Sequence, residues 1–156
     1  MIAIIDYGAG NIFSVKNALD YLGFENKLTN RKEDIINADA LILHGVVAFP
    51  WAMNMLKLSG LVDVIKEQAQ FKPFLGICLG MQLLFEKSYE FEECSGLGLV
   101  KGYVDKINEP ELVIPHMGWN KLEYNHDCRL FDGLTNDEYV YFVHSYKAFC
   151  EDRYLY

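Results

Sequence analysis

One cysteine lies between two glycines, at a point where an apolar run gives way to a helix-favouring run. Residues 73–85 are Pro-Phe-Leu-Gly-Ile-Cys-Leu-Gly-Met-Gln-Leu-Leu-Phe. This pattern is typical of a buried strand that turns sharply into a helix with a nucleophile at the corner. Gly76 and Gly80 would let the two backbones approach closely. We therefore predict that Cys78 is a catalytic nucleophile, although isolated cysteines are usually small buried core residues.

The predicted corner would also supply groups that help the sulfur to react. Unpaired N–H groups and the dipole at a helix N-terminus favour thiolate over thiol. The backbone N–H of Leu79 would point toward an oxyanion forming on an attacked carbonyl. The expected chemistry at Cys78 is therefore nucleophilic attack on a carbonyl carbon.

Short apolar runs alternate with helix-favouring segments over the first 88 residues. The expected strands are 2–5, 24–28, 38–43 and 73–77, and the expected helices are 11–22, 30–37, 52–58, 61–71 and 79–88. This alternation predicts an α/β fold with a mostly parallel, flavodoxin-like sheet and helices on both faces. Since sites gather at the carboxyl ends of such strands, the loops 8–11 and 44–50 should both reach Cys78.

The second half of the chain has a different residue pattern. An acidic stretch with Glu90, Glu92 and Glu93 is expected to be a solvated loop, and glycines interrupt short strands over 96–104. A turn is expected at 114–120, a short strand at 121–124, and a strong strand at 139–146. We expect a single domain over residues 1–156, with a mainly antiparallel layer formed by its second half.

Composition excludes several classes of function. The chain has 156 residues and a net charge of −8, so a nucleic-acid or anionic-membrane partner is not expected. No apolar run reaches the roughly 18 residues of a membrane span. The four cysteines lack Cys-x-x-Cys spacing, which argues against zinc and fits a reducing cytoplasm. The Gly-Ala-Gly at 8–10 lacks the third glycine of a dinucleotide site, and we expect no cofactor and no metal.

Five segments together resemble the class I glutamine amidotransferases, and among them the glutaminase subunits of imidazole glycerol phosphate synthase. They occur in the family's order at residues 4–11, 76–82, 96–99, 115–120 and 141–146. Gly-x-Cys-x-Gly alone indicates only the broad class. Pro-His-Met-Gly-Trp-Asn at 115–120 and Tyr-Phe-Val-His-Ser-Tyr at 141–146 narrow the resemblance to this subunit.

The resemblance implies a reaction and a partner. Cys78 would attack the side-chain amide of glutamine and form a glutamyl thioester, and the released ammonia would travel to a barrel-shaped cyclase subunit of histidine biosynthesis. The residues that would hold glutamine are Gln82, His144, Ser145 and Tyr146. The residues that would lie near the partner and the ammonia exit are Asn11, Trp119 and Asn120.

The sequence departs from the family at the catalytic base. A cysteine amidase needs a base to move the thiol proton, and in the family this base belongs to a later His-Pro-Glu segment. Residues 1–156 contain no such segment, and His116 and His144 belong to other family segments, where we expect structural or interface roles. We therefore expect the domain to be C-terminally incomplete relative to the family, without normal glutaminase turnover.

A second departure affects the oxyanion strand. Where the family has Pro-Gly-Val-Gly, this chain has His44, Gly45, Val46 and Val47. Glycine adopts positive φ cheaply and valine does not, so a second oxyanion donor from Gly45 to Val47 is in doubt. His44 is a candidate substitute base, but a simple packing substitution is the favoured interpretation.

Two alternatives stay open at this stage. The chain could be a paralogue that feeds ammonia to another acceptor, such as a sugar-amidating partner, which identification of the bound barrel would decide. It could instead be a non-catalytic interaction subunit, which failure of a glutamine-like electrophile to label Cys78 would favour.

Overall fold

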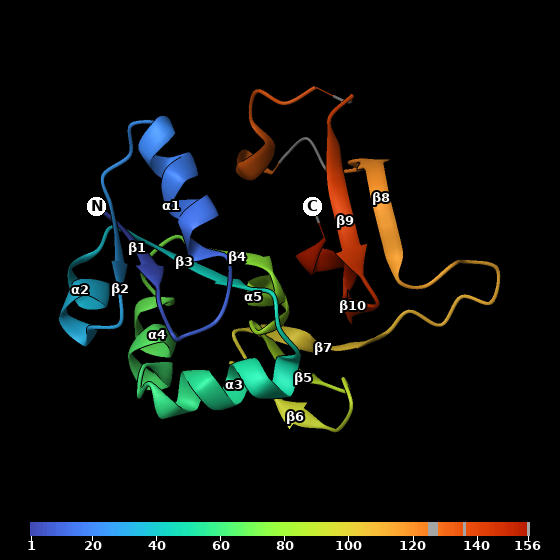
Figure 1. The fold of residues 1–156 in the computed structure, drawn as a ribbon, viewed down its shortest axis with the longest axis horizontal. Coiled ribbons are helices and arrows are strands. Elements are labelled where there is room, and N and C mark those ends of the chain that lie inside the picture. Colours follow the sequence, from blue (N-terminus) through green and yellow to red (C-terminus); the bar gives the residue numbers. More distant parts are fainter. Residues whose placement is uncertain (125–127, 136, 156) are drawn as a thin grey trace.

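The first half of the chain builds a four-stranded parallel sheet (Figure 1). The computed structural model describes residues 1–124, 128–135 and 137–155. In spatial order the strands are β2 (Asn26–Thr29), β1 (Ile2–Ile5), β3 (Ala40–Gly45) and β4 (Phe74–Cys78). Every neighbouring pair is parallel, which confirms the predicted mostly parallel sheet.

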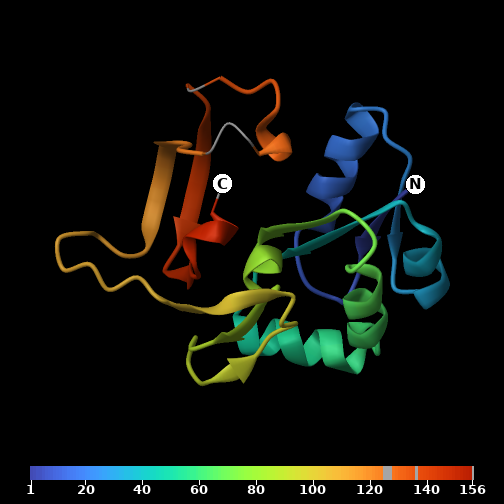
Figure 2. The same cartoon turned by 180° about the vertical axis from the view of Figure 1, so that it is seen from behind.

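Helices cover both faces of this sheet, as Figures 1 and 2 show. Helix α1 lies on one face, and three others lie toward the opposite face. The bounds are α1 (Ile12–Tyr21), α2 (Lys32–Asn37), α3 (Phe49–Leu58) and α4 (Val62–Gln68). Gly23 follows α1 with φ +76°, the left-handed conformation with which glycine commonly ends a helix.

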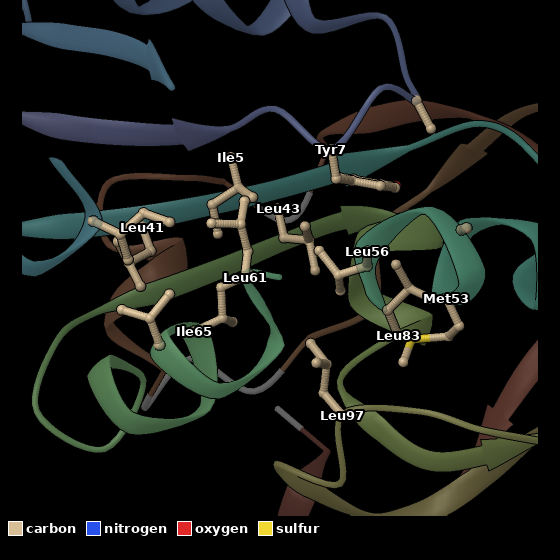
Figure 3. Close-up of a cluster of buried hydrophobic side chains, with 14 of the residues drawn as sticks. Ile5, Tyr7, Leu41, Leu43, Met53, Leu56, Leu61, Ile65, Leu83 and Leu97 are labelled. Atoms are coloured by element: carbon tan, nitrogen blue, oxygen red, sulfur yellow. The ribbon is translucent and has the colours of Figure 1, made fainter. Parts of the chain in front are cut away.

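The hydrophobic core lies between the sheet and helices α3 and α4 (Figure 3). Side chains alternate along a strand, so Ile5 of β1 and Leu43 of β3 point to this face, while Ile4 points away from it. Met53 and Leu56 of α3 meet them at helical spacing, and all these side chains are almost fully buried. The packing of this core fixes the position of the sheet, and therefore of the strand ends at which the site is built.

The predicted helix over 79–88 is wrong beyond its first turn. Helix α5 spans only Leu79–Gln82, and the chain then enters strand β5 (Phe85–Ser88). The carbonyls of Leu83 and Leu84 accept hydrogen bonds from the backbone of Leu97 and Leu99 instead of continuing a helix. Tertiary pairing therefore overrides the helix propensity of the apolar run.

The second half forms another four-stranded sheet and a separate hairpin (Figure 1). The second sheet has the order β10 (Tyr146–Phe149), β7 (Val100–Lys106), β5 and β6 (Cys94–Ser95). Its pairs are antiparallel except β5 with β7, so the predicted antiparallel layer is largely confirmed.

The hairpin pairs β8 (His116–Lys121) with β9 (Tyr139–His144) in antiparallel register. The turn predicted at 114–120 is therefore mostly strand, and the strand predicted at 121–124 is wrong beyond Lys121. Two short 3-10 helices, η1 (Arg129–Phe131) and η2 (Asp152–Tyr154), complete the elements of the described chain.

No helix within the described residues is long and apolar enough to cross a membrane. Within the same ranges, no three side chains of His, Cys, Asp or Glu come together in a way that could hold a metal ion.

Candidate active site

Cys78 lies at the corner between β4 and α5, as the sequence predicts. Its backbone has φ 55° and ψ −119°, a region that side chains avoid because Cβ crowds the neighbouring carbonyl. Among the non-glycine residues that the structure describes, only Cys78 and Phe91 have positive φ. The residue is exposed, so the strained turn holds a reachable thiol. The strand that leads to it is at the edge of the sheet and is half-buried to exposed, so the prediction of a buried strand is wrong.

The two flanking glycines are needed for close backbone approach. A Cβ added to Gly80 would lie 1.9 Å from the carbonyl oxygen of Leu43, and one added to Gly76 would lie 2.5 Å from the Cα of Met81. The packing reason given for Gly-x-Cys-x-Gly is thus confirmed. The expected dipole effect is not, since α5 has only four residues and the predicted helix had about three turns.

The neighbouring strand is locked beside this corner. Gly45 of β3 pairs with Cys78 in the register of the sheet, and a Cβ at Gly45 would lie 2.4 Å from the hydroxyl of Tyr7. That hydroxyl is buried and donates a 2.9 Å hydrogen bond to the carbonyl of His44. Burial raises the pKa of Tyr7 to about 12, so the phenol keeps its proton and this bond at neutral pH.

A pocket of about 430 Å³ opens at Cys78 and joins four distant parts of the chain. The loop after β3 contributes three small apolar residues, the corner contributes the thiol and its neighbours, and the end of the β9 strand closes the far side. The lining residues are Val46, Val47, Ala48, Cys78, Leu79, Gln82, Glu90, Pro115, Val143, His144, Ser145 and Tyr146.

Most of the predicted site residues meet in this pocket, and some do not. Cys78, Leu79, Val47, Gln82 and the segment 144–146 all line it. Gly45 lies next to the corner in the strand register without lining the pocket, and Asn11, Trp119 and Asn120 lie elsewhere.

The loop 8–11 reaches the strand beside Cys78, since a Cβ added to Gly10 would lie 3.4 Å from the Cα of Gly45, which pairs with Cys78. The loop contributes no residue to the lining of the pocket. Gly10 instead faces His44, where a Cβ would lie 2.5 Å from the ring Nδ1. The loop therefore packs over the buried end of β3, because Gly10 offers no side chain to hold it away.

The far side of the pocket is tied together by hydrogen bonds. The side-chain amide of Gln82 donates to the carbonyl of Tyr146 at 3.3 Å, and His144 Nδ1 lies 2.9 Å from the same oxygen. The other ring nitrogen of His144 lies 3.1 Å from His116 Nδ1. Both nitrogens of the one imidazole that lines the pocket in the described chain are thus already engaged.

Glu90 is a pocket residue that the sequence prediction placed on a solvated face. Its carboxylate accepts a 2.7 Å hydrogen bond from the backbone N–H of Phe49, at the start of α3. It is the one acidic side chain among the lining residues. Its place depends on β5, which the predicted long helix concealed, so sequence spacing alone offered no signal for it.

Comparison with known proteins identifies the family. The profile described as Glutamine amidotransferase class-I matches residues 3–151. The chain belongs to the class-I glutamine amidotransferase family. The sequence-based resemblance, which rested on five short segments, is therefore confirmed over nearly the whole length of this chain.

Relatives within this family are named as subunit HisH of imidazole glycerol phosphate synthase. The Bacillus cereus (strain B4264) protein is 53% identical over 153 residues, covering 97% of this chain and 73% of its own. The Bacillus mycoides (strain KBAB4) protein is 50% identical over 157 residues, covering 100% of this chain and 75% of its own. A solved structure, "Crystal structure of glutamine amidotransferase", has a TM-score of 0.70 at 21% identity, covering 92% of this chain and 71% of that one, and it supports the amidotransferase fold.

His44 and Val47 are the two residues that depart from the family pattern at the oxyanion strand, and the structure shows the environment of each. His44 is only 7% exposed, and its Nδ1 has no hydrogen-bond partner among the described residues. Burial lowers the pKa of this imidazole, which keeps it neutral. His44 does not line the Cys78 pocket, and Val47 keeps an ordinary backbone conformation, without positive φ.

Proposed function

We propose that this chain is the glutaminase subunit of an imidazole glycerol phosphate synthase. The observation that carries the proposal is the exposed Cys78 thiol, held with φ 55° at a strand-to-helix corner that opens into a pocket. Such strain at a reachable nucleophile recurs where covalent catalysis takes place. The similarity to HisH proteins over almost the full chain supports glutamine as the substrate.

The chemistry proposed for Cys78 proceeds in two steps. The sulfur bonds to the side-chain amide carbon of glutamine, the C–N bond breaks, and the nitrogen leaves with the thiol proton as ammonia. The backbone N–H of Leu79, which follows the sulfur directly, would stabilise the oxyanion of the intermediate. Water then cleaves the thioester, which gives glutamate and restores the thiol.

The pocket offers suitable groups for the amino-acid end of glutamine. The Glu90 carboxylate would attract the α-ammonium group, because a charge-assisted hydrogen bond is favourable where water is partly excluded. Gln82 and the backbone of Ser145 and Tyr146 would receive the remaining polar atoms. Together with Cys78 these groups would set the length of the substrate side chain.

An exposed apolar face of the hairpin supports a protein partner. Trp119 and Met117 of β8 are 68% and 61% exposed, and Tyr141 and Val143 lie opposite them on β9 with 52% and 57% exposed. Clustered aromatic and apolar side chains of this kind are typical of interfaces. We propose that the cyclase barrel docks on this face, near Asn120, and that Asn11 lies toward the same partner.

The proposed compartment is the cytoplasm. All four cysteines are free, and unpaired thiols persist where the surroundings are reducing. Histidine biosynthesis, to which the partner belongs, would place the chain in the same compartment.

The proposal is tested by covalent labelling of the thiol. A diazoketone analogue of glutamine should add one adduct to Cys78, excess glutamine should slow the reaction, and Cys78→Ala should remove it. Intact-mass and peptide analysis would locate the adduct, with Cys94 as the internal comparison. Absence of an adduct on Cys78, both alone and with the cyclase subunit, would overturn the proposal.

The engaged nitrogens of His144 favour a second candidate function. In the described chain no imidazole that lines the pocket has a nitrogen free to accept the Cys78 proton. This arrangement suits a subunit that binds glutamine and its partner without turnover. Glutamate release measured with the cyclase present separates the two: labelling without release supports this second function.

A further inference from the structure

A continuous series of hydrogen bonds runs from the exposed edge of β8 into the Cys78 pocket. Asn120 Oδ1 lies 2.9 Å from His116 Nε2, and His116 Nδ1 lies 3.1 Å from His144 Nε2. His144 Nδ1 lies 2.9 Å from the carbonyl oxygen of Tyr146, which also accepts a bond from Gln82 at 3.3 Å. Five residues on four elements, β8, β9, β10 and α5, are thereby linked.

The protons in this series are constrained by chemistry. A carbonyl oxygen can only accept, so the proton of His144 is on Nδ1. In the neutral ring Nε2 is then an acceptor, and His116 Nδ1 must donate to it. A single proton therefore lies between the two rings.

Packing holds the two rings in place. His116 and His144 are directly opposite in the hairpin register, and both are partly buried. The His116 ring stacks on Phe142, with centroids 5.2 Å apart and an interplanar angle of 26°. The ring of Phe142 also lies 5.7 Å from that of His144. The imidazoles are therefore orientated by the hairpin itself before any ligand enters the pocket.

We propose that His116 and His144 are positioning residues that fix the Tyr146 carbonyl, and through it the Gln82 side chain, for glutamine binding. The inference rests on the proposed function, because it assigns a role within the same pocket. Both lone pairs of the Tyr146 carbonyl are used, one by each donor. Loss of the His144 proton from this oxygen would free the carbonyl and the Gln82 amide to move together.

The expected effect is on binding and not on sulfur reactivity. Neither imidazole reaches the thiol in this arrangement, since every ring nitrogen is engaged along the series. Loss of one neutral hydrogen bond weakens an interaction by about 3- to 10-fold. Alkylation of Cys78 by the diazoketone analogue should therefore show a higher KI in a disrupted variant, with kinact unchanged.

Two substitutions at His116 separate hydrogen bonding from packing. His116→Phe keeps an aromatic ring to stack on Phe142 but has no donor for His144. His116→Asn loses the ring but places an amide nitrogen close to the position of Nδ1. We expect KI to rise by about 3- to 10-fold in His116→Phe and to be largely restored in His116→Asn. The rate of Cys78 alkylation by iodoacetamide, which does not use the pocket, should be equal in all three proteins.

A spectroscopic measurement tests the series without any variant. Nitrogen-15 NMR of the histidine side chains should show His144 protonated at Nδ1, in slow exchange with water. An unprotonated Nδ1 would overturn the proposal, as would a wild-type KI in His116→Phe or an equal loss in both variants. If the analogue fails to label wild-type Cys78, the proposed function falls, while the NMR result still decides the hydrogen-bonded series.

Discussion

Cys78 keeps a backbone conformation that costs a non-glycine residue about 1–3 kcal/mol, so the surrounding packing must hold it there. Gly80 is the tightest part of that packing, because an added Cβ would meet the Leu43 carbonyl at 1.9 Å. The strained backbone of Cys78 and the close contact at Gly80 belong to the same turn. A substitution at Gly80 should therefore change both the stability of the protein and the reactivity of the thiol.

We expect Gly80→Ala to destabilise the protein by about 3 kcal/mol or more, the upper end of the usual range for overpacking. Thermal unfolding gives the measurement. Gly60→Ala is the comparison, since nothing lies within 4 Å of a Cβ added there. Gly60, unlike Gly80, has positive φ, so this change should cost only about 1–2 kcal/mol for the left-handed backbone. Equal losses in the two variants would contradict the clash.

Glu90 combines a structural bond with a charge in the pocket. Glu90→Gln keeps an oxygen to accept the Phe49 N–H, so the start of α3 should stay intact, but it removes the negative charge. Charge-assisted hydrogen bonds are worth about 1.5–3 kcal/mol, so the KI of the glutamine analogue should rise by roughly 10- to 100-fold. Glu92→Gln, outside the pocket lining, should leave KI unchanged, and an unchanged KI in Glu90→Gln would exclude the ammonium contact.

At the scale of elements, the hairpin of β8 and β9 presents two different faces. One carries the paired histidines that lead toward the pocket, and the other carries the exposed Trp119 and Tyr141, whose rings meet edge to face at 5.6 Å. Residues one position apart along a strand point to opposite faces. A partner on the exposed face would therefore lie on the opposite side of the hairpin from the hydrogen-bonded series.

The exposed face gives a binding prediction. Trp119→Ala should weaken association with the cyclase subunit by at least tenfold, as expected for a buried aromatic at an interface, and should leave the melting temperature of the isolated chain nearly unchanged. Phe71→Ala removes a comparably exposed ring, 80% exposed, at a distance from the hairpin and should bind normally. Titration calorimetry of the two variants decides between a specific face and general surface hydrophobicity.

Elements with strong local patterns could be predicted, and those decided by distant pairing could not. Apolar runs alternate with helix-favouring segments up to Cys78. This alternation predicted the parallel sheet, because the strands of parallel sheets are usually continuous apolar runs. The end of α5 depends on segment 97–100, which takes the carbonyls of Leu83 and Leu84, and no local pattern contains that information. The missed role of Glu90 and the misplaced β8 follow from the same dependence on tertiary contacts.

The site shows the same division. Cys78 and its glycines are a local motif and were identified from spacing, whereas the link between Gln82 and Tyr146 joins residues 64 positions apart. Family resemblance, not physical derivation, brought the segment 144–146 into the prediction. Neither the residue pattern nor the family resemblance predicted the His116–His144 contact. Each histidine, considered alone, looks like an ordinary partly buried side chain.

At the scale of the whole molecule, the pocket lies where the carboxyl ends of the parallel strands meet the second sheet and the hairpin. Ligands commonly bind at this edge of open parallel sheets. Cys78 ends β4, and the lining residues Val46 and Val47 directly follow β3, so the geometry of the pocket depends on how these two strands pack. His44 is a buried ionisable side chain of β3 that lies next to Gly10 and outside the pocket lining.

The buried His44 makes the stability of the molecule depend on pH. Burial lowers its pKa in the folded state from the ordinary value of 6.5, so between these two values the unfolded chain binds more protons than the folded one. The contribution of His44 to stability is therefore fully present above about pH 6.5, and it is lost as the pH falls through 6.5 toward the folded-state pKa. Below the folded pKa both states are protonated, and this contribution changes no further.

His44→Leu removes the titrating ring and the unpaired Nδ1 while keeping a side chain of similar bulk. Its free energy of unfolding, measured by urea titration at several pH values, should fall less than that of the wild type between pH 7 and pH 5. His144→Leu is the comparison, because His144 is hydrogen-bonded at both nitrogens and is not enclosed in the sheet. Parallel pH profiles for wild type and His44→Leu would mean that the folded protein accommodates the imidazolium, and hence that the loop over β3 opens to water.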